Sequence, residues 1–224
     1  MINVAIDGPA GAGKSSIARK VASKLGYIYV DTGALYRTVA LKAANCGLTA
    51  ETPEKIEEML CNTTVGIKFV NGEQRMMLDG ADVTGSIRTP EVSMLASSVS
   101  AIPAVRAYLL NTQRRLAAEN NVIMDGRDIG TVVLPDAQIK IFLTASAEDR
   151  AERRFKELKE KGMDVNYDDV LADIKTRDYN DSHRAVAPLK PAPESILADT
   201  SGNEFEESVA LIESIISEKL KEVM

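Results

Sequence analysis

The stretch GPAGAGKS at residues 8–15 constrains the fold of this chain more than any other feature. It fills every fixed position of the pattern GxxxxGK[ST]. A short apolar run ending at Ile6 precedes it, and the apolar residues after it recur at helical spacing until Gly26. A strand, a glycine-rich loop and a helix in this order turn backbone N–H groups and the positive end of the helix toward a phosphate chain. The pattern therefore predicts an α/β phosphate-binding fold.

ATP and Mg²⁺ are the ligands expected at this loop. Lys14 would reach the β- and γ-phosphates, and Ser15 would ligate Mg²⁺. Asp125 ends the apolar run NVIMD, and two interpretations of it stay open. It orders Mg²⁺ through a water molecule, or it pairs with Lys14 or caps a helix. The nucleotide-binding residues expected here are Gly8, Pro9, Ala10, Gly11, Ala12, Gly13, Lys14, Ser15 and Ser16.

Further strands and helices follow the loop in an alternating order. Residues 27–30 are typical of a buried strand, and Asp31 or Thr32 would cap a helix that ends at Asn45. Three more buried strands are indicated at residues 121–125, 139–143 and 195–198. This alternation predicts an α/β fold like that of P-loop NTPases, with a parallel five-stranded sheet and helices on both faces.

One segment interrupts this order of strands and helices. Its apolar residues recur at every second position, and it contains the turn dipeptides Asn71-Gly72 and Asp79-Gly80. These features predict a small inserted antiparallel β lobe over residues 48–95. Farther along, Ser146 and Asn166 would cap two polar helices, which predict a helical lid over residues 146–185. We therefore expect one kinase-like domain over residues 1–224, whose core comprises 1–47, 96–145 and 186–224.

Composition excludes several classes of function. The formal net charge of −6 argues against a broad nucleic-acid surface, and no run approaches the roughly 20 apolar residues of a membrane span. Cys46 and Cys61 have no metal-like or redox spacing, which indicates reduced thiols in a cytoplasmic protein. His183 is the single histidine, so a histidine-centred metal site is excluded. We expect a monomer that acts on small molecules.

The classes that share this loop can be separated. GTPases recognise guanine with NKxD, and the chain has no Asn-Lys pair. The pattern DxxG occurs at Asp82 and Asp199, the first inside the expected lobe and the second after the last strand. Motor ATPases are normally larger than this chain of 224 residues. The length and the motifs favour a small kinase.

Arginines follow the predicted strands and indicate a second anion. Arg37 comes shortly after the second strand, and Arg127 and Asp128 lie just past the third. Ligands gather at the carboxyl ends of parallel strands, so Arg37 and Arg127 are expected near Lys14. Guanidinium groups suit a phosphate monoester, which would be the acceptor of the transferred phosphate. Arg177, Asp181 and Arg184 are spaced to share one face of a helix.

With these residues in place, the sequence resembles the bacterial cytidylate kinases over essentially the whole chain. The resemblance is carried by GPAGAGKS, VDTGALYR, GSIRTPEVS, MDGRDIGTVVLPDAQIKIFL and HRAVAPL, in the order and spacing of that family. It implies an enzyme of pyrimidine metabolism that transfers the γ-phosphate of ATP to CMP or dCMP, with Mg²⁺. No nucleophilic side chain is needed for such an in-line transfer.

The resemblance also implies roles for individual residues. The stretch DYNDSH departs most from the family's pattern. The ribose contacts that the resemblance implies for Arg177 and Asp181 therefore depend most on the matching residues around this stretch. A carboxylate suits the amino group of cytosine, and a guanidinium suits its acceptors. The implied catalytic residues are Lys14, Arg127 and Arg184. The implied substrate residues are Arg37, Arg127 and Arg184 for the CMP phosphate, Arg177 and Asp181 for the ribose, Ser97, Arg106 and Asp128 for the base, and Thr32 where the family has Ser or Thr.

Two alternatives remain open at this point. One is another small P-loop kinase, for UMP, dTMP or shikimate, against which the inserted lobe argues only through the resemblance. The other is a P-loop protein that senses nucleotides without turnover. An assay for ADP formation with and without CMP tests for the sensing protein, and the same assay across CMP, dCMP, UMP, AMP and dTMP tests for another kinase.

Overall fold

The computed structural model of the chain describes residues 1–160 and 162–223, which divide into two compact units. The first unit comprises Met1–Tyr29 and Asn121–Met224, and the second comprises Val30–Asn120. The predicted division into core, inserted lobe and lid is a functional one and stays a prediction.

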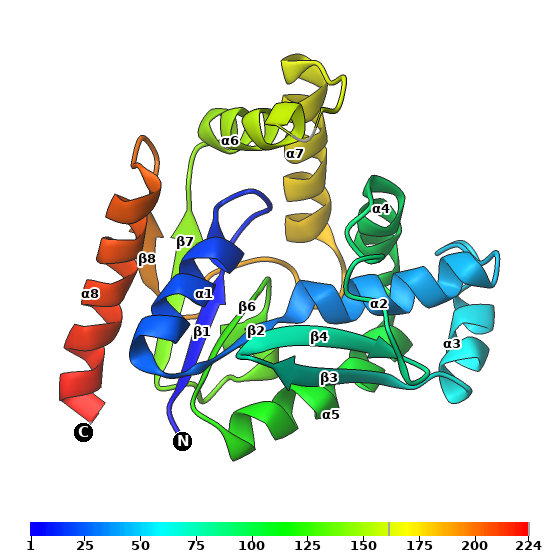
Figure 1. Cartoon of the computed structure of the whole chain (residues 1–224), viewed down its shortest axis with the longest axis horizontal. Helices are drawn as coiled ribbons and strands as arrows, with labels where there is room; N and C mark the ends of the chain where they lie inside the picture. Colours follow the sequence, from blue (N-terminus) through cyan, green and yellow to red (C-terminus); the bar gives the residue numbers. More distant parts are fainter. Residues whose placement is uncertain (161, 224) are drawn as a thin grey trace. The chain divides into compact units, whose positions relative to one another are not determined.

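A five-stranded parallel sheet organises the first unit (Figure 1). Its strand order is β2-β6-β1-β7-β8. Ile6 of the central strand lies opposite Asp125 on one side and Ile141 on the other, so the carboxyl ends of the three inner strands meet at one edge. This confirms the predicted parallel sheet. The strands are β1 (Asn3–Asp7), β2 (Ile28–Asp31), β6 (Val122–Gly126), β7 (Ile139–Thr144) and β8 (Ile196–Asp199), and the last two residues of β2 belong to the second unit.

Two helices cover one face of this sheet, α1 (Lys14–Leu25) and α8 (Phe205–Val223). They lie side by side in Figure 1. The apolar residues of α1 that recur at helical spacing are buried against the strands, as the pattern predicts. Gly26 adopts φ 68° and ends α1, a left-handed conformation that glycine tolerates without strain.

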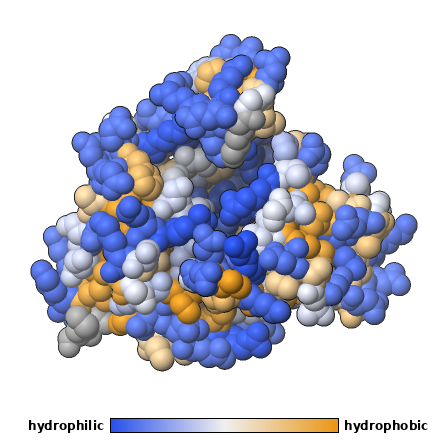
Figure 2. Space-filling model, viewed as in Figure 1, coloured by the Kyte–Doolittle hydropathy of each residue, from blue (hydrophilic) through white to orange (hydrophobic). Residues whose placement is uncertain are grey.

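A second pair of helices in this unit, α6 (Ala147–Glu160) and α7 (Tyr167–His183), packs on a small apolar cluster of its own. The predicted caps are confirmed. The Ser146 hydroxyl accepts from the Asp149 N–H at 3.0 Å, and the Asn166 side chain accepts from the Asp168 N–H at 2.8 Å. Most of the surface seen over these two helices is hydrophilic (Figure 2). The buried apolar residues that the two helices share are Ala151, Leu158, Val170 and Ile174.

The second unit combines four helices with an antiparallel sheet of order β3-β4-β5. Its turns contain Asn71 and Gly72 at φ 53° and 78°, and Asp79 and Gly80 at φ 50° and 86°. Both predicted hairpin turns are thus confirmed. The elements are α2 (Thr32–Asn45), α3 (Pro53–Cys61), β3 (Val65–Val70), β4 (Glu73–Leu78), β5 (Ala81–Asp82), α4 (Pro90–Val99) and α5 (Pro103–Glu119).

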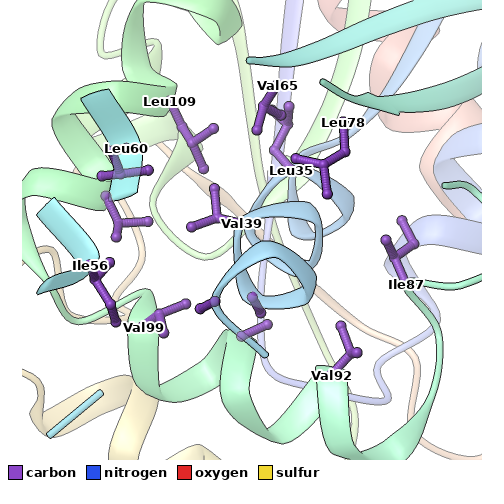
Figure 3. Packing of buried hydrophobic residues seen from close by; sticks show 14 of the residues in the cluster. Leu35, Val39, Ile56, Leu60, Val65, Leu78, Ile87, Val92, Val99 and Leu109 are labelled. Carbon is purple, nitrogen blue, oxygen red and sulfur yellow. The ribbon is translucent and has the colours of Figure 1, made fainter. Parts of the chain in front are cut away.

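Helix α3 lies in the segment for which the sequence pattern predicts an antiparallel lobe. Pro53 occupies its first turn, and Ile56, Met59 and Leu60 are buried at helical spacing. These residues join the core of the second unit, which surrounds α2. Figure 3 shows this cluster, with Leu35, Val39, Ile56, Leu60, Val65, Leu78, Ile87, Val92, Val99 and Leu109.

The two consecutive helices α4 and α5 meet at an angle of 100°. No single helix among the described residues is long and apolar enough to cross a membrane, and these two pass that test only when taken together, on length and composition alone. Their buried residues Val92, Val99, Val105 and Leu109 belong to the core cluster around α2.

Candidate active site

The phosphate loop runs from the end of β1 to the first residue of α1. Gly8, Gly11 and Gly13 adopt φ 151°, 76° and 83°, values that favour glycine. A Cβ at Gly8 would overlap the backbone carbonyl oxygen of Leu143. Gly13 is the N-cap of α1 and has no side chain that could satisfy the first N–H groups of that helix. The loop is therefore shaped for an anion at the helix N-terminus.

Lys14 is 5% exposed, and its Nζ donates to the carbonyl oxygen of Pro9 at 2.7 Å. Burial, together with the positive charge of Arg127, lowers the pKa of Lys14 from 10.5 to about 7. The carboxylates of Asp125 and Asp181 act in the opposite direction. Phosphate groups placed beside this amine would stabilise its charged form, which is the form that can neutralise a transferring phosphate.

Asp125 makes two short contacts at the sheet. Its Oδ2 accepts from the Ser15 hydroxyl at 2.8 Å, and its Oδ1 accepts from the Tyr29 hydroxyl at 2.9 Å. Asp125 lies inside β6, and Ser15, which donates to it, lies in the first turn of α1. Both interpretations of Asp125 therefore stay open. A serine hydroxyl beside a buried carboxylate supplies the oxygen ligands that Mg²⁺ prefers, so these residues fit the metal. Tyr29 is a part of this arrangement that the sequence pattern does not reveal.

Arg127 and Asp128 follow the end of β6, as predicted. The backbone then forms a single π-helical turn, η1 (Ile129–Val133), where the sequence pattern indicates only a loop. Asp7, at the end of the neighbouring strand β1, is 2% exposed and accepts from the N–H groups of Ile129 at 2.8 Å and Gly130 at 2.7 Å. Asp7 thus fixes the turn that follows Arg127 and Asp128.

The buried position of Asp7 raises its pKa from 3.8 to about 6, although the two N–H donors act to lower it. The negative charge of Asp128 contributes to this rise, and the positive charge of Lys14 opposes it. No role for Asp7 was inferred from the sequence. The available signal was an acid at the end of an apolar strand, directly before the phosphate loop.

Two ion pairs join the residues after β6 to the end of α7. The Arg127 Nε donates to the Asp181 Oδ2 at 2.7 Å. The Arg184 Nη2 lies 3.6 Å from the Asp128 Oδ1. The structure therefore brings together four of the predicted site residues within the first unit.

Arg177 and Asp181 lie on α7, as predicted, but Arg184 does not. It is the C-cap of that helix, with φ −63° and ψ 142°, and its Nε donates to the carbonyl oxygen of Ala187 at 2.6 Å. Its side chain is therefore directed by the chain after the helix and not by helical spacing. Burial lowers the pKa of Arg177, which a nearby Asp173 partly opposes.

In the second unit, Asp31 organises the start of α2, where Thr32 and Arg37 lie. Its Oδ1 caps the helix by accepting from the Ala34 N–H at 2.9 Å. Its Oδ2 accepts from the Arg37 Nη2 at 2.9 Å and from the Arg88 Nη2 at 3.0 Å. The Arg37 Nε is buried without a hydrogen-bond partner among the described residues. Arg88, within the quoted GSIRTPEVS, was not singled out from the sequence.

The two predicted base-reading residues of this unit meet around Ser100. The carbonyl oxygen of Ser97, in α4, accepts from the Ser100 hydroxyl at 2.7 Å. The Arg106 Nη1, in α5, donates to the carbonyl oxygen of Ser100 at 3.1 Å. The Arg106 guanidinium also lies 5.6 Å from the centre of the Tyr36 ring, at a distance typical of a cation–π contact. Arg106 is thus held in a buried, defined position.

Comparison with known proteins gives the family. The model of the family described as cytidylate kinase matches residues 4–218. A cytidylate kinase of Caldicellulosiruptor saccharolyticus is 56% identical over 92% of this chain and 91% of its own length, and one of Carboxydothermus hydrogenoformans is 49% identical over 97% and 98%. A solved structure of an uncharacterized protein from Eubacterium ventriosum has a TM-score of 0.54 at 12% identity, covering 97% of this chain and 99% of that one, and shows a shared fold alone. The chain belongs to the cytidylate kinase family.

Proposed function

We propose that the protein transfers the γ-phosphate of ATP to CMP or dCMP, and that ADP and CDP or dCDP are the products. The observation that carries the proposal is the complete phosphate loop with its buried Lys14, in a chain that matches the cytidylate kinase family over residues 4–218. The family membership favours CMP over UMP, dTMP or shikimate as the acceptor.

On the donor side, residues 8–16 bind the phosphates of ATP through their backbone N–H groups, except at Pro9, which has none. Lys14 holds the β- and γ-phosphates, and the short contact between Ser15 and Asp125 offers oxygen ligands for Mg²⁺. When bound, Mg²⁺ neutralises charge on the phosphates. Whether Asp125 contacts the metal itself or a water molecule on it, the carboxylate fixes the Ser15 hydroxyl.

On the acceptor side, the ion pairs within each unit hold the arginines ready for a second anion. Arg127 and Arg184 pair with Asp181 and Asp128, and Arg37 pairs with Asp31. A phosphate monoester would offer these guanidinium groups additional, bidentate acceptors. We assign Arg37, Arg127 and Arg184 to the CMP phosphate, Arg177 and Asp181 to the ribose, Ser97, Arg106 and Asp128 to the base, and Thr32 to the substrate as well.

The proposed reaction is an in-line displacement. A CMP phosphate oxygen forms a bond to the γ-phosphorus while the bond from that phosphorus to the ADP oxygen breaks. Lys14, Arg127 and Arg184 align the two anions and neutralise charge on the transferred group. Within the single domain, we assign residues 48–95 to the inserted nucleotide-binding lobe and 146–185 to a lid that excludes water during transfer.

ADP formation, measured by a coupled assay with CMP, dCMP, UMP, AMP or dTMP as the acceptor, tests the proposal. We expect turnover with CMP or dCMP that greatly exceeds turnover with the other three, and almost none in a folded Lys14→Ala variant. Preference for UMP or dTMP would favour another small kinase. ATP binding without acceptor-dependent ADP formation would indicate a sensing protein.

A monomeric state and a cytoplasmic location complete the proposal. Sedimentation of the purified protein and fractionation of cells that express it test these two points. A stable dimer at the working concentration, or recovery in the membrane fraction, would contradict them.

A further inference from the structure

A buried arginine outside the predicted site contacts the phosphate loop. Arg150 lies in the first turns of α6 and is 4% exposed. Its Nη1 donates to the carbonyl oxygen of Ala10 at 2.9 Å, within the loop that in Figure 1 follows β1. Its Nε donates to the carbonyl oxygen of Ala145 at 2.9 Å. One guanidinium therefore joins the phosphate loop to the connection between β7 and α6.

The same guanidinium makes a bidentate pair with Asp178 of α7. The Nη1 lies 3.0 Å from the Asp178 Oδ1, and the Nη2 lies 2.6 Å from the Asp178 Oδ2. Bidentate arginine–carboxylate pairs are strong and geometrically specific, and a lysine cannot reproduce them. Burial of the arginine charge is tolerated here because the carboxylate and the two carbonyl oxygens accept from it.

The contact bears directly on the shape of the loop. A phosphate loop must turn its N–H groups toward the phosphates, and a hydrogen bond from Arg150 to the Ala10 carbonyl fixes the orientation of a peptide group there. Gly11 packs closely on this arginine, since a Cβ at Gly11 would lie 3.3 Å from the Arg150 Cβ and 3.7 Å from the Ile174 Cδ1. Helices α6 and α7 thus support the loop from outside.

Asp178 also ties this support to the acceptor residues. It directly follows Arg177 on α7, and Asp181 lies less than one turn beyond it. We propose that Arg150 is a positioning residue, which holds the phosphate loop in its binding conformation and, through Asp178, joins the loop to the helix that carries Arg177 and Asp181. This inference rests on the proposed function only for the role of those two acceptor residues.

The test compares Arg150→Lys, Asp178→Asn and the double variant with the wild-type protein. Lys156→Ala is the matched control, since Lys156 lies on the same helix and, among the described residues, makes an exposed ion pair with Glu152. We expect Arg150→Lys to raise the dissociation constant of ATP, measured by calorimetry without CMP, by roughly 10- to 100-fold, the scale of a lost charged hydrogen bond. The control should bind ATP as the wild type does.

Two further measurements separate positioning from general stability. Amide hydrogen exchange within residues 8–13 should be faster in Arg150→Lys and Asp178→Asn, at a temperature where both variants are folded. The double variant should bind ATP no more weakly than Arg150→Lys alone, because the two residues act as one pair. Losses of ATP affinity that add up in the double variant would overturn the inference. So would single variants whose ATP affinity and amide exchange are unchanged while their melting temperature is lowered.

These measurements do not depend on the acceptor. If the wild-type protein bound ATP but failed to phosphorylate CMP, the proposed function would be wrong. The same measurements of ATP binding and exchange would still test the role of Arg150 at the loop. If Arg150→Lys did not fold, Asp178→Asn, which keeps the shape of the side chain, would decide the matter through the exchange of residues 8–13.

Discussion

The altered pKa of Lys14 predicts that ATP binding takes up a proton. With a pKa of about 7, the amine of the free protein is roughly nine-tenths protonated at pH 6, about half protonated at pH 7 and about one-tenth protonated at pH 8. Phosphate groups beside the amine stabilise the ammonium form and raise its pKa again. Uptake should therefore rise from about 0.1 proton per ATP at pH 6 to about 0.9 at pH 8.

Titration calorimetry in buffers of different ionisation enthalpy measures this uptake, because the observed enthalpy changes linearly with the buffer's enthalpy and the slope is the number of protons. The matched variant is Lys14→Arg, since a guanidinium stays charged throughout this pH range. Its uptake should be near zero at pH 8. An uptake near zero in the wild-type protein at pH 8, or equal uptakes in the two proteins, would refute the reasoning from burial.

Four further predictions concern single residues. Arg127→Ala should raise the KM for CMP and lower kcat, whereas a collapse of ATP affinity without CMP would place Arg127 on the donor side. Asp125→Asn should raise the Mg²⁺ concentration for half-maximal activity by about tenfold or more, and an unchanged Mg²⁺ dependence would exclude this carboxylate from the metal site. Asp128→Ala should cost CMP roughly 2 to 4 kcal/mol in kcat/KM and UMP much less; an unchanged ratio of the two would make Asp128 structural. Asp7 has its folded pKa raised to about 6, so its stabilising contribution is complete below pH 3.8 and is lost as the pH rises through 6. In urea unfolding, the stability of the wild type relative to Asp7→Asn should thus fall by roughly 1 to 2 kcal/mol between pH 5 and pH 7.5, and a difference independent of pH would contradict the raised pKa.

The fold was predictable wherever the signal is local. The fixed positions of residues 8–15 and the stop at Gly26 define the first loop and helix, and Asn71-Gly72 defines the hairpin turn. Helix α3 was missed although Pro53 and three apolar residues at helical spacing were present. The nearby hairpin signals dominate this segment, so the sequence pattern predicts an antiparallel lobe without a helix at residues 53–61.

The site was less predictable because its side chains are directed by distant parts of the chain. Asp7 accepts from backbone groups more than 120 residues away, and Arg150 contacts Ala10 across 140 residues. Neither contact leaves a motif in the sequence. Arg184 illustrates a different limit: its spacing from Asp181 suits a helical face, but the helix ends one residue before it. Residue spacing in the sequence therefore predicts which side chains share a face only within one continuous helix.

The most direct test of the central claim follows the phosphate itself. The protein is incubated with CMP, Mg²⁺ and ATP that carries a radioactive label in its γ-phosphate, and the products are separated over time. The account predicts that the label appears in CDP in step with the formation of ADP, and that little appears as inorganic phosphate. Label that accumulates as inorganic phosphate at the same rate with and without CMP would contradict the claim that this protein is a CMP kinase.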